Sequence, residues 1–492
     1  MKLFDLINSS DTDIALPAED AEIRTICYDS RKALKGSLFV CIKGVLTDGH
    51  KYALMAYKQG CRCFVCERMP EDLPEDATVL FSNNTREALA KLAAAFFGHP
   101  ERKMKLIGIT GTKGKTTTAL MIKGIMDGCD RPCGYIGSNG VDFAGFHFDT
   151  VNTTPEGCDI YEYLSRMLAV GVNTAVLEVS SQALYMGRVT GLTFDACVFT
   201  NFSRDHIGEH EHPDMDHYKA CKLRLFSEHC GGYALINADD PVSGEFAEAA
   251  KRAGNEVEFF SSCEQTDYSA GEIEYFKNEK GLCSSFYGDF KGKRLKVKQK
   301  FPGDFSVMNA LSALAVCRHL GVDLKMAIRK LEKVSIKGRF ETLRLGGVDY
   351  VIDYAHNGKS LRSVLEVLRT YEPGRLICLF GSVGGRTHMR RPELGRVAAE
   401  LADLSILTAD NPDIEPVARI IADIAAEYTD PDSYVAIPDR KEAIEYAVKI
   451  ARPGDIVLLA GKGHEDYQLI NGRRIPFSER EILMNAAAAL VV

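Results

Sequence analysis

The sequence predicts an α/β protein of three domains with largely parallel sheets, and three observations lead to this class. The chain has 492 residues, which is too long for one hydrophobic core. Short apolar runs alternate with amphipathic helical stretches along its whole length, a pattern typical of strands joined by helices. Gly98-His99-Pro100 ends one such series and Gly338 opens another. We therefore place the domains at residues 1–100, 101–335 and 336–492.

In the first domain, short apolar segments bounded by polar turns alternate with stretches of helical periodicity. The stretch ending at the Gly-His-Pro boundary is the most strongly helical of these. Strands are expected at residues 23–28, 37–42 and 62–66, and helices at 52–59 and 85–97.

In the second domain, a strand at 105–110 leads directly into a glycine-rich loop, and alternating strands and helices follow to about residue 335. Residues 256–300 are expected to hold short strand-like and turn-like pieces. The third domain alternates again and is expected to contain strands at 349–352, 375–380, 404–408 and 456–460.

Composition excludes several classes of protein. The 46% of hydrophobic residues exclude wholesale disorder, and no run of apolar residues is long enough to span a membrane. The first residues carry early acidic side chains and no basic region before an apolar core, so no secretory signal is expected. The formal net charge of −8 argues against a nucleic-acid partner. We expect a monomer.

The cysteines indicate a reducing compartment. There are 15, an odd number, and most stand singly at apolar positions, which favours buried thiols in the cytoplasm over a disulfide scaffold. Cys63 and Cys66 have the spacing of a metal or redox pair. In a strand, however, side chains three positions apart point to opposite faces, so we expect no zinc site there.

A phosphate-binding loop is the strongest single motif. The strand at 105–110 runs into a glycine-rich turn, and a helix is expected to begin at about Lys115. Glycines let backbone N–H groups converge on phosphate oxygens, and the helix N-terminus adds partial positive charge. Lys115 would reach the terminal phosphates and the Thr116 hydroxyl would bind Mg²⁺. The candidate nucleoside-triphosphate-binding residues are Gly111, Thr112, Lys113, Gly114, Lys115, Thr116 and Thr117.

Further motifs follow in a fixed order, and together with this loop they resemble the Mur ligases, in particular the members that add the third amino acid to the peptidoglycan precursor. The likeness covers essentially the whole chain. The motifs begin at Tyr28-Asp29-Ser30-Arg31, Thr47-Asp48-Gly49-His50, Asn152-Thr153-Thr154-Pro155, Glu178-Val179-Ser180-Ser181, Thr200 to His206, Tyr218 to Lys222, Phe305 to Asn309, Gly338-Arg339-Phe340-Glu341, Asp353 to Asn357, Asp410-Asn411-Pro412-Asp413 and Gly461 to Gln468.

The resemblance implies a three-domain Mur ligase fold, with a central P-loop ATPase-type parallel sheet and a Rossmann-like C-terminal domain. It implies an ATP- and Mg²⁺-dependent ligase in peptidoglycan biosynthesis. The carboxylate of UDP-N-acetylmuramoyl-L-alanyl-D-glutamate would attack the γ-phosphate, and the amine of a diamino acid would displace phosphate from the resulting acyl phosphate. The first domain would bind the uridine end, the second ATP and metal, and the third the incoming amino acid.

The resemblance also implies a metal site. Thr116, Glu178 and His206 are its expected ligands, and Glu178 follows an apolar strand at the position where open α/β sheets bind ligands. The family's Tyr-x-x-x-Lys lysine corresponds to Lys222 and would be carbamylated, becoming an anionic ligand; Lys219 is the rival. Lys115, Lys222, His206 and Arg339 are the implied catalytic residues.

Two further groups of binding residues are implied. Arg339 would reach the γ-phosphate as the third domain closes over ATP. The other implied ATP-binding residues are Asn309, Asp353 and His356. The implied UDP-muramyl dipeptide contacts are Ser30, Asn152, Thr153, Thr154, Ser180 and Arg188.

The choice of amino acid rests on Asp413. Members that add diaminopimelate usually carry arginine there to hold the distal carboxylate. A carboxylate would repel that group and attract an ammonium, which favours L-lysine over meso-diaminopimelate, with ornithine also open. Arg390 or Arg391 could instead take over the arginine's role. The implied amino-acid-binding residues are Arg386, Asp410, Asn411, Asp413, Gly461 and Glu465.

Three alternatives belong to other classes. A folylpolyglutamate- or cyanophycin-type ligase would keep the acyl-phosphate chemistry with another acceptor. A degenerate nucleotide-gated binding protein would have lost metal or phosphate ligands, yet Lys115, Thr116 and Glu178 are all present. A serine hydrolase at Ser180-Ser181 lacks the surrounding Gly-x-Ser-x-Gly turn.

Overall fold

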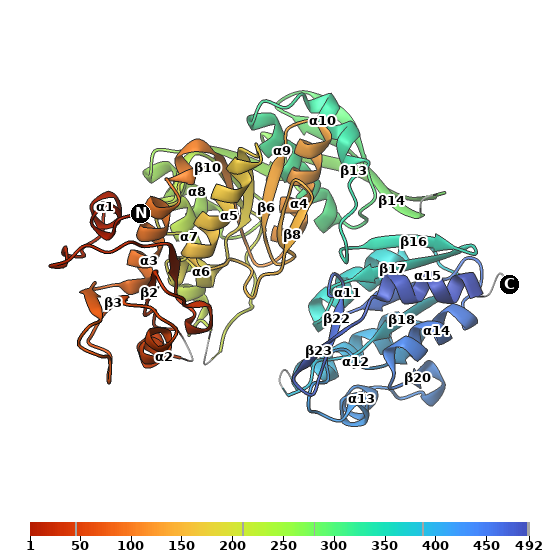
Figure 1. Cartoon of the computed structure of the whole chain (residues 1–492). Coiled ribbons are helices and arrows are strands. Elements are labelled where there is room, and N and C mark those ends of the chain that lie inside the picture. The colour runs from red at the N-terminus through yellow and green to blue at the C-terminus, as the bar shows by residue number, and fades with distance from the viewer. Residues whose placement is uncertain (45–46, 209–210, 280, 386–387, 490–492) are drawn as a thin grey trace. The chain divides into compact units, whose positions relative to one another are not determined.

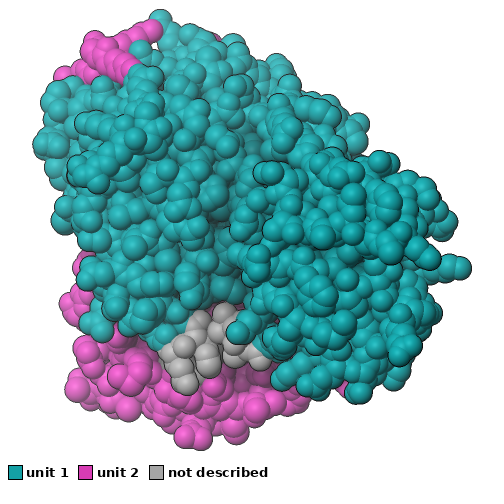
Figure 2. Space-filling view, turned by 90° about the vertical axis from the view of Figure 1, so that its left-hand side faces the viewer, with its two compact units in different colours: residues 1–269, 312–327 teal, residues 270–311, 328–492 magenta. Residues whose placement is uncertain are grey.

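The computed structural model describes residues 1–492 except 45–46, 209–210, 280, 386–387 and 490–492. The described residues divide into two compact units, coloured separately in Figure 2. Unit 1 comprises residues 1–269 and 312–327, and unit 2 comprises 270–311 and 328–492. The predicted α/β class with parallel sheets is confirmed.

Unit 1 begins with a small parallel sheet in the order β1-β2-β3-β4. Cys63 and Cys66 lie at the two ends of β3, as predicted, and all 15 cysteines are free thiols. The elements of this part are α1 (Leu3–Ser9), β1 (Thr25–Cys27), β2 (Ser37–Val40), α2 (Ala53–Lys58), β3 (Cys63–Cys66), β4 (Thr78–Phe81) and α3 (Thr85–Phe96).

The central sheet of unit 1 runs in the order β12-β11-β10-β5-β9-β6-β7-β8. Figure 1 labels β6, β8 and β10 of this sheet. The pairs from β12 to β6 are parallel, whereas β7 and β8 return as antiparallel strands. Its strands are β5 (Lys105–Thr110), β6 (Cys133–Gly137), β7 (Gly140–Phe143), β8 (Phe146–Phe148), β9 (Thr174–Glu178), β10 (Phe194–Phe199), β11 (Cys230–Asn237) and β12 (Glu256–Ser261).

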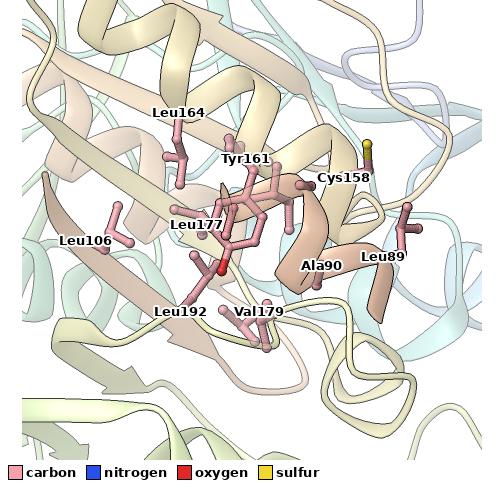
Figure 3. Close-up of a cluster of buried hydrophobic side chains, with 14 of the residues drawn as sticks. Leu89, Ala90, Leu106, Cys158, Tyr161, Leu164, Leu177, Val179 and Leu192 are labelled. Carbon is pink, nitrogen blue, oxygen red and sulfur yellow. The ribbon is translucent and has the colours of Figure 1, made fainter. Parts of the chain in front are cut away.

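Helices cover this sheet, and β5 is buried from Leu106 to Thr110, as expected for a parallel strand covered on both faces. The first hundred residues share a core with it: Leu89 of α3 packs in the same cluster as Leu106 of β5 and Leu164 of α5 (Figure 3). The predicted division at residues 100 and 335 stays a prediction. The helices are α4 (Lys115–Gly128), α5 (Gly157–Ala169), α6 (Ser181–Tyr185), α7 (Met215–Glu228) and α8 (Ser243–Arg252).

The prediction of short pieces at 256–300 was wrong. β13 (Tyr268–Asn278) and β14 (Gly281–Phe290) are eleven and ten residues long, and β14 pairs antiparallel with β15 (Arg294–Gln299). Much of β13 is exposed, and a sheet with a solvated face accepts the polar residues that hid the strand pattern. Helices α9 (Asp304–His319) and α10 (Leu324–Leu331) follow, and β13, α9 and α10 each cross from one unit to the other.

Unit 2 contains a sheet in the order β16-β17-β21-β18-β19-β20, parallel throughout except for β16 against β17. The predicted strands of this region lie within one residue of β17, β18, β19 and β21. Its strands are β16 (Glu341–Leu345), β17 (Val348–Asp353), β18 (Leu376–Phe380), β19 (Leu404–Leu407), β20 (Tyr434–Ala436) and β21 (Ile456–Ala460).

A hairpin of β22 (Tyr467–Ile470) and β23 (Arg473–Pro476) follows this sheet. In the part of the chain that the structure describes, no helix combines the length and the apolar character needed to cross a bilayer. The helices of unit 2 are α11 (Gly358–Arg369), α12 (Arg390–Leu401), α13 (Val417–Ala425), α14 (Arg440–Ile450) and α15 (Glu479–Ala489).

Candidate functional site

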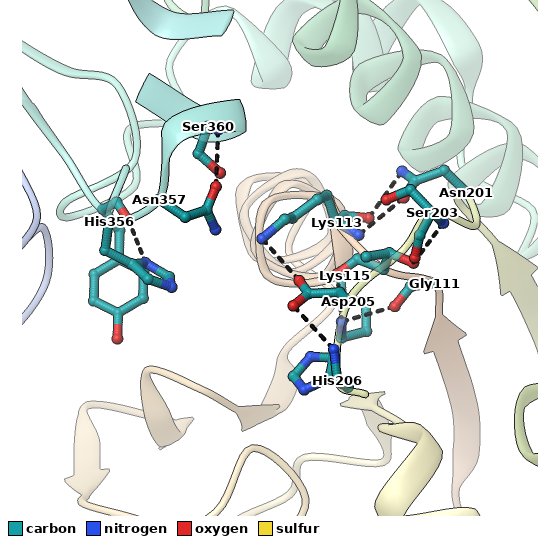
Figure 4. Close-up of polar contacts among 12 residues, drawn as sticks. Gly111, Lys113, Lys115, Asn201, Ser203, Asp205, His206, His356, Asn357 and Ser360 are labelled. Atoms are coloured by element: carbon teal, nitrogen blue, oxygen red, sulfur yellow. Dashed lines mark hydrogen bonds and ion pairs between the residues drawn. The ribbon is translucent and has the colours of Figure 1, made fainter. Parts of the chain in front are cut away.

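The glycine-rich loop joins β5 to α4, which begins at Lys115 as predicted. Gly111 has φ +149°, and a Cβ there would lie 1.9 Å from Thr200 Oγ1, so only glycine fits. Gly114 caps α4 in the left-handed region. Lys115 Nζ donates to the carbonyls of Gly111 at 2.9 Å and Thr112 at 3.2 Å, so the amine lies back over the loop (Figure 4).

The loop is held from the side by the segment that follows β10. Asn201 Oδ1 accepts from the Lys113 N–H at 2.9 Å, and Asn201 Nδ2 donates to the Lys113 carbonyl at 3.0 Å (Figure 4). Thr200 Oγ1 donates to the same carbonyl at 2.7 Å. Sequence reasoning placed only His206 of this motif in the site and missed the role of Thr200 and Asn201. The only signal in the sequence was the motif itself.

Two predicted metal ligands meet at the start of α4. Thr116 Oγ1 donates to Glu178 Oε2 at 2.9 Å, and Glu178, at the end of β9, is fully buried. A buried carboxylate needs hydrogen bonds in place of water, and Glu178 accepts them from the Ser138 N–H at 3.0 Å and from the Tyr135 hydroxyl. These oxygen donors suit a hard cation such as Mg²⁺. Sequence reasoning did not identify Tyr135 and Ser138.

His206 is the predicted ligand that lies apart from this pair in the described contacts. Its ring is exposed, with Nδ1 3.1 Å from Glu211 Oε1. Asp205 beside it forms an ion pair with Lys113 at 3.3 Å (Figure 4). Burial would raise the pKa of Asp205, but the Lys113 and His206 charges outweigh it and lower the pKa.

Lys222 reaches the phosphate loop from α7. Its side chain is buried, and Nζ donates to the Gly111 carbonyl at 2.8 Å and lies 4.6 Å from the centre of the Tyr218 ring. Burial, and secondly the Lys115 charge, hold the pKa of the Lys222 amine well below its usual value. The rival Lys219 instead forms an ion pair with Glu245 at 2.8 Å.

Predicted substrate residues of unit 1 join the same network. Thr154 Oγ1 donates to the Glu178 carbonyl at 2.7 Å and lies 3.2 Å from Ser180 Oγ. Arg188 Nη1 donates to the Thr154 carbonyl at 3.2 Å, and its Nε bonds to Glu156. Glu156 also pairs with Arg86, and neither residue was predicted.

Of the three remaining predicted substrate residues, one bonds to this network and two lie elsewhere in unit 1. Thr153 joins it through the Ser138 hydroxyl at 3.0 Å. Ser30 is buried in the first part of the chain, where its hydroxyl contacts Met55 Sδ at 3.2 Å, and Asn152 is exposed.

In unit 2, the predicted ATP-binding motifs pack against one another. A Cβ on Gly338 would lie 2.0 Å from the backbone nitrogen of His464, so the glycine allows the two loops to pack against each other. The Phe340 N–H donates to Asp353 Oδ2 at 2.8 Å, and Arg339 lies over the Tyr354 ring. Burial raises the pKa of Asp353, against the opposing charge of Arg339.

The other two predicted ATP-binding residues are part of secondary structure or bonded to backbone. Asn309 is buried in α9. His356 Nδ1 lies 2.9 Å from the Tyr354 carbonyl (Figure 4).

The predicted amino-acid-binding residues surround Lys462, which sequence reasoning did not assign. This lysine is fully buried, and Nζ contacts Asn411 Oδ1 and Glu465 Oε2, both at 3.1 Å, and Asp410 at 3.7 Å. A Cβ on Gly461 would lie 3.1 Å from Asp410 Oδ2. Arg386 lies outside the described residues.

Asp413 forms an isolated bridge with Ile470 of β22. Its φ is +50°, its N–H donates to the Leu469 carbonyl, and its carboxylate accepts from the Gly472 N–H at 2.6 Å. The carboxylate therefore holds the hairpin β22–β23. Arg391 is fully buried and bonds to Glu415 and Asp423, so it is committed to that ion pair.

Known proteins resemble the whole chain. It matches the profiles described as Mur ligase family, catalytic domain, at residues 22–97, Mur ligase middle domain at 109–317, and Mur ligase, glutamate ligase domain, at 338–463.

Individual known proteins also match nearly the whole chain. A protein of Caldanaerobacter subterraneus subsp. tengcongensis, named UDP-N-acetylmuramoyl-L-alanyl-D-glutamate–2,6-diaminopimelate ligase, is 39% identical over 99% of both chains. A Clostridium tetani protein of the same name is 36% identical over 98% of both. A solved structure of a ligase of that name has a TM-score of 0.68, 27% identity and 96% coverage of both chains. The chain belongs to the Mur ligase family.

Proposed function

We propose that this chain joins the amino group of a diamino acid to UDP-N-acetylmuramoyl-L-alanyl-D-glutamate, with cleavage of ATP to ADP and phosphate. One observation carries the proposal: a single hydrogen-bond network runs from Thr116 of the phosphate loop through Glu178 to Thr154, Ser180 and Arg188. Groups suited to a triphosphate and to a carboxylated sugar peptide are therefore contiguous. Relatives of 36–39% identity bear the name of this reaction.

Each part of the network has a role in this reaction. The loop N–H groups and Lys115 bind the phosphates, and Thr116 and Glu178 would hold Mg²⁺, which supplies positive charge where two anions must meet. Arg188 would bind a substrate carboxylate. The carboxylate of the peptide attacks the γ-phosphate, and the amine then displaces phosphate to form the amide.

Carbamylation of Lys222 is part of the proposal. The modification requires an unprotonated amine, and the amine here is buried and contacts a carbonyl oxygen. Addition of CO₂ to the neutral amine, with release of one proton to solvent, would form an N–C bond and give a carbamate whose oxygens could bind metal beside the phosphate loop. The reaction also needs ATP and a nucleotide-linked precursor, so we propose a cytoplasmic enzyme.

The first candidate for the amino acid is 2,6-diaminopimelate. The argument for L-lysine assumed a free carboxylate at Asp413, but that carboxylate accepts a hydrogen bond from Gly472. The named relatives act on 2,6-diaminopimelate. L-Lysine stays the second candidate because Asp413 still places a negative charge where other members carry arginine.

Phosphate release from ATP tests the proposal, with the UDP-muramyl dipeptide and each of meso-diaminopimelate, L-lysine and ornithine. We expect release to require both the dipeptide and one diamino acid, with the tripeptide product identified by mass. Lys115→Ala should reduce turnover by about 10²–10³-fold, while Lys103→Ala, at an exposed lysine before the start of β5, should not. Phosphate release without any tripeptide product would refute the proposal.

A further inference from the structure

Two histidines and a cysteine meet at the start of α7, and the proposed ligase reaction uses none of them. His212 precedes the helix, and His217 and Cys221 lie one turn apart on it. Residues four apart face the same side of a helix. The Asp214 carboxylate caps α7 by accepting from the His217 N–H at 2.8 Å, which fixes the first turn under His212.

The three side chains are within reach of one ion. His212 Nδ1 lies 2.9 Å from His217 Nδ1, and Cys221 Sγ lies 3.7 Å from His217 Nδ1. One ligand atom from each residue lies within 4.8 Å of the other two. The rings and the thiol are at hydrogen-bonding distance from one another, so an ion with bonds of about 2.0–2.1 Å to nitrogen and about 2.3 Å to sulfur could replace these contacts with small side-chain shifts.

The outer side of His212 is also arranged as in a metal site. Its ring is fully buried, and Nε2 lies 2.9 Å from Ser181 Oγ. A histidine that binds a metal typically donates its second ring N–H to an oxygen, which fixes the tautomer and leaves the other nitrogen as the ligand. With Nε2 turned to Ser181, Nδ1 of His212 faces the cluster.

We propose that His212 Nδ1, a ring nitrogen of His217 and Sγ of Cys221 bind a borderline-soft divalent cation of the Zn²⁺ class, with the fourth position left to water. Two imidazoles and a thiolate suit Zn²⁺ or Co²⁺, whereas the oxygen donors of Thr116 and Glu178 suit Mg²⁺. Binding releases the Cys221 thiol proton to solvent, and no electron transfer is involved.

The described residues contain a second group of possible metal ligands, and it shows that suitable residue types alone do not make a metal site. His388, Glu415 and Asp423 also have ligand atoms close together. However, the buried guanidinium of Arg391 lies 2.7 Å from both carboxylates and already supplies the positive charge. The cations near the cluster on α7 are Lys222 and Arg224, and their side chains bond elsewhere, to the Gly111 carbonyl and to the Leu184 carbonyl and Glu228.

An ion in this site would connect two predicted catalytic residues. The His212 N–H donates to the His206 carbonyl at 3.0 Å, and Cys221 immediately precedes Lys222. Occupancy would therefore tie the segment that carries His206 to the helix that carries Lys222.

Cobalt titration of the full chain tests the site. The reduced, chelator-treated protein is held in saturating Mg²⁺ and titrated with Co²⁺. We expect one Co²⁺ per chain, with a thiolate-to-cobalt charge-transfer band and the visible bands of tetrahedral cobalt, both removed by Zn²⁺. Cys221→Ser should abolish the charge-transfer band, and His217→Gln should weaken Co²⁺ binding about tenfold or more. Cys263→Ser, at an exposed cysteine, is the matched control.

The same variants distinguish Co²⁺ bound at this site from Co²⁺ bound elsewhere on the chain. A charge-transfer band that persists in Cys221→Ser, or Co²⁺ binding that is absent in saturating Mg²⁺, overturns the site. If Cys221→Ser does not fold, His217→Gln decides, because its ring is only half-buried: unchanged Co²⁺ affinity overturns the site and weakened affinity supports it.

Discussion

Two buried lysines, one in each unit, stand in opposite electrostatic surroundings. Lys222 of unit 1 bonds to a backbone carbonyl and lies near the charge of Lys115. Lys462 of unit 2 contacts two carboxylates, those of Asp410 and Glu465. The first environment disfavours an ammonium and suits a neutral or modified amine, whereas the second places two carboxylates beside the amine. Burial disfavours the ammonium of Lys222, whereas at Lys462 two carboxylates offset the cost of burial, so the neighbours set the difference between the two lysines.

The largest effect is expected from replacing Lys462, the buried lysine that lies beside two carboxylates. Lys462→Met leaves the buried Asp410 and the half-buried Glu465 without their cation, so unfolding of unit 2 should become easier by about 3–5 kcal/mol. Chemical denaturation measures this. Lys441→Met, which removes only a surface pair with Glu445, should change the free energy by less than about 1 kcal/mol. Equal changes in the free energy of unfolding for Lys462→Met and Lys441→Met would show that the charge of Lys462 is not needed to balance its carboxylates.

The second test asks whether Lys222 acts as a cation or as a carbamate. Lys222→Ala should lower turnover by about 10²–10³-fold. Lys222→Arg keeps the charge but cannot be carbamylated, so it should be equally impaired, and added acetate should restore part of the activity of Lys222→Ala only. Phosphate release measures all three, with Lys219→Ala as the control. Full activity in Lys222→Arg would show that the charge alone suffices.

A smaller effect is expected from weakening the support of Glu178. Tyr135→Phe removes one hydrogen bond to this carboxylate. The Mg²⁺ concentration for half-maximal turnover should rise about 10- to 100-fold, because groups that orient a metal ligand tune its affinity. Tyr161→Phe removes a hydroxyl that bonds to the Thr190 carbonyl and should leave the Mg²⁺ dependence unchanged. An unchanged requirement in Tyr135→Phe would argue against a metal at Glu178.

The smallest effect is expected at Asp413. Asparagine also tolerates the left-handed conformation and can accept the Gly472 hydrogen bond, so Asp413→Asn should preserve stability while removing the charge. If the carboxylate serves the turn, the ratio of kcat/KM for diaminopimelate over lysine should stay within about twofold. Competition between the two amino acids measures it. A tenfold shift, worth about 1.4 kcal/mol, would restore the electrostatic argument for lysine.

Local pattern was a sound guide to the elements near the nucleotide loop. The strand at 105–110 and the helix from Lys115 are where the sequence predicts them. Buried parallel strands are continuous apolar runs, and this helix starts directly after the glycine-rich turn at Gly114, so both signals lie within a few neighbouring residues. The long strand β13 was missed because its exposed positions interrupt the apolar pattern, whereas β14 is largely buried but carries glycine and serine among its apolar residues.

The amino-acid sequence was enough to predict the α/β class, the phosphate loop and the residues of each motif, because these depend on local periodicity and residue type. The contacts that several of those residues make became visible only in the folded chain. Asn201 bonds to Lys113, Glu178 is held by Tyr135, and Asp413 bonds to Gly472. Each of these partners is brought close by the packing of separate strands and loops, so no local pattern records the contact.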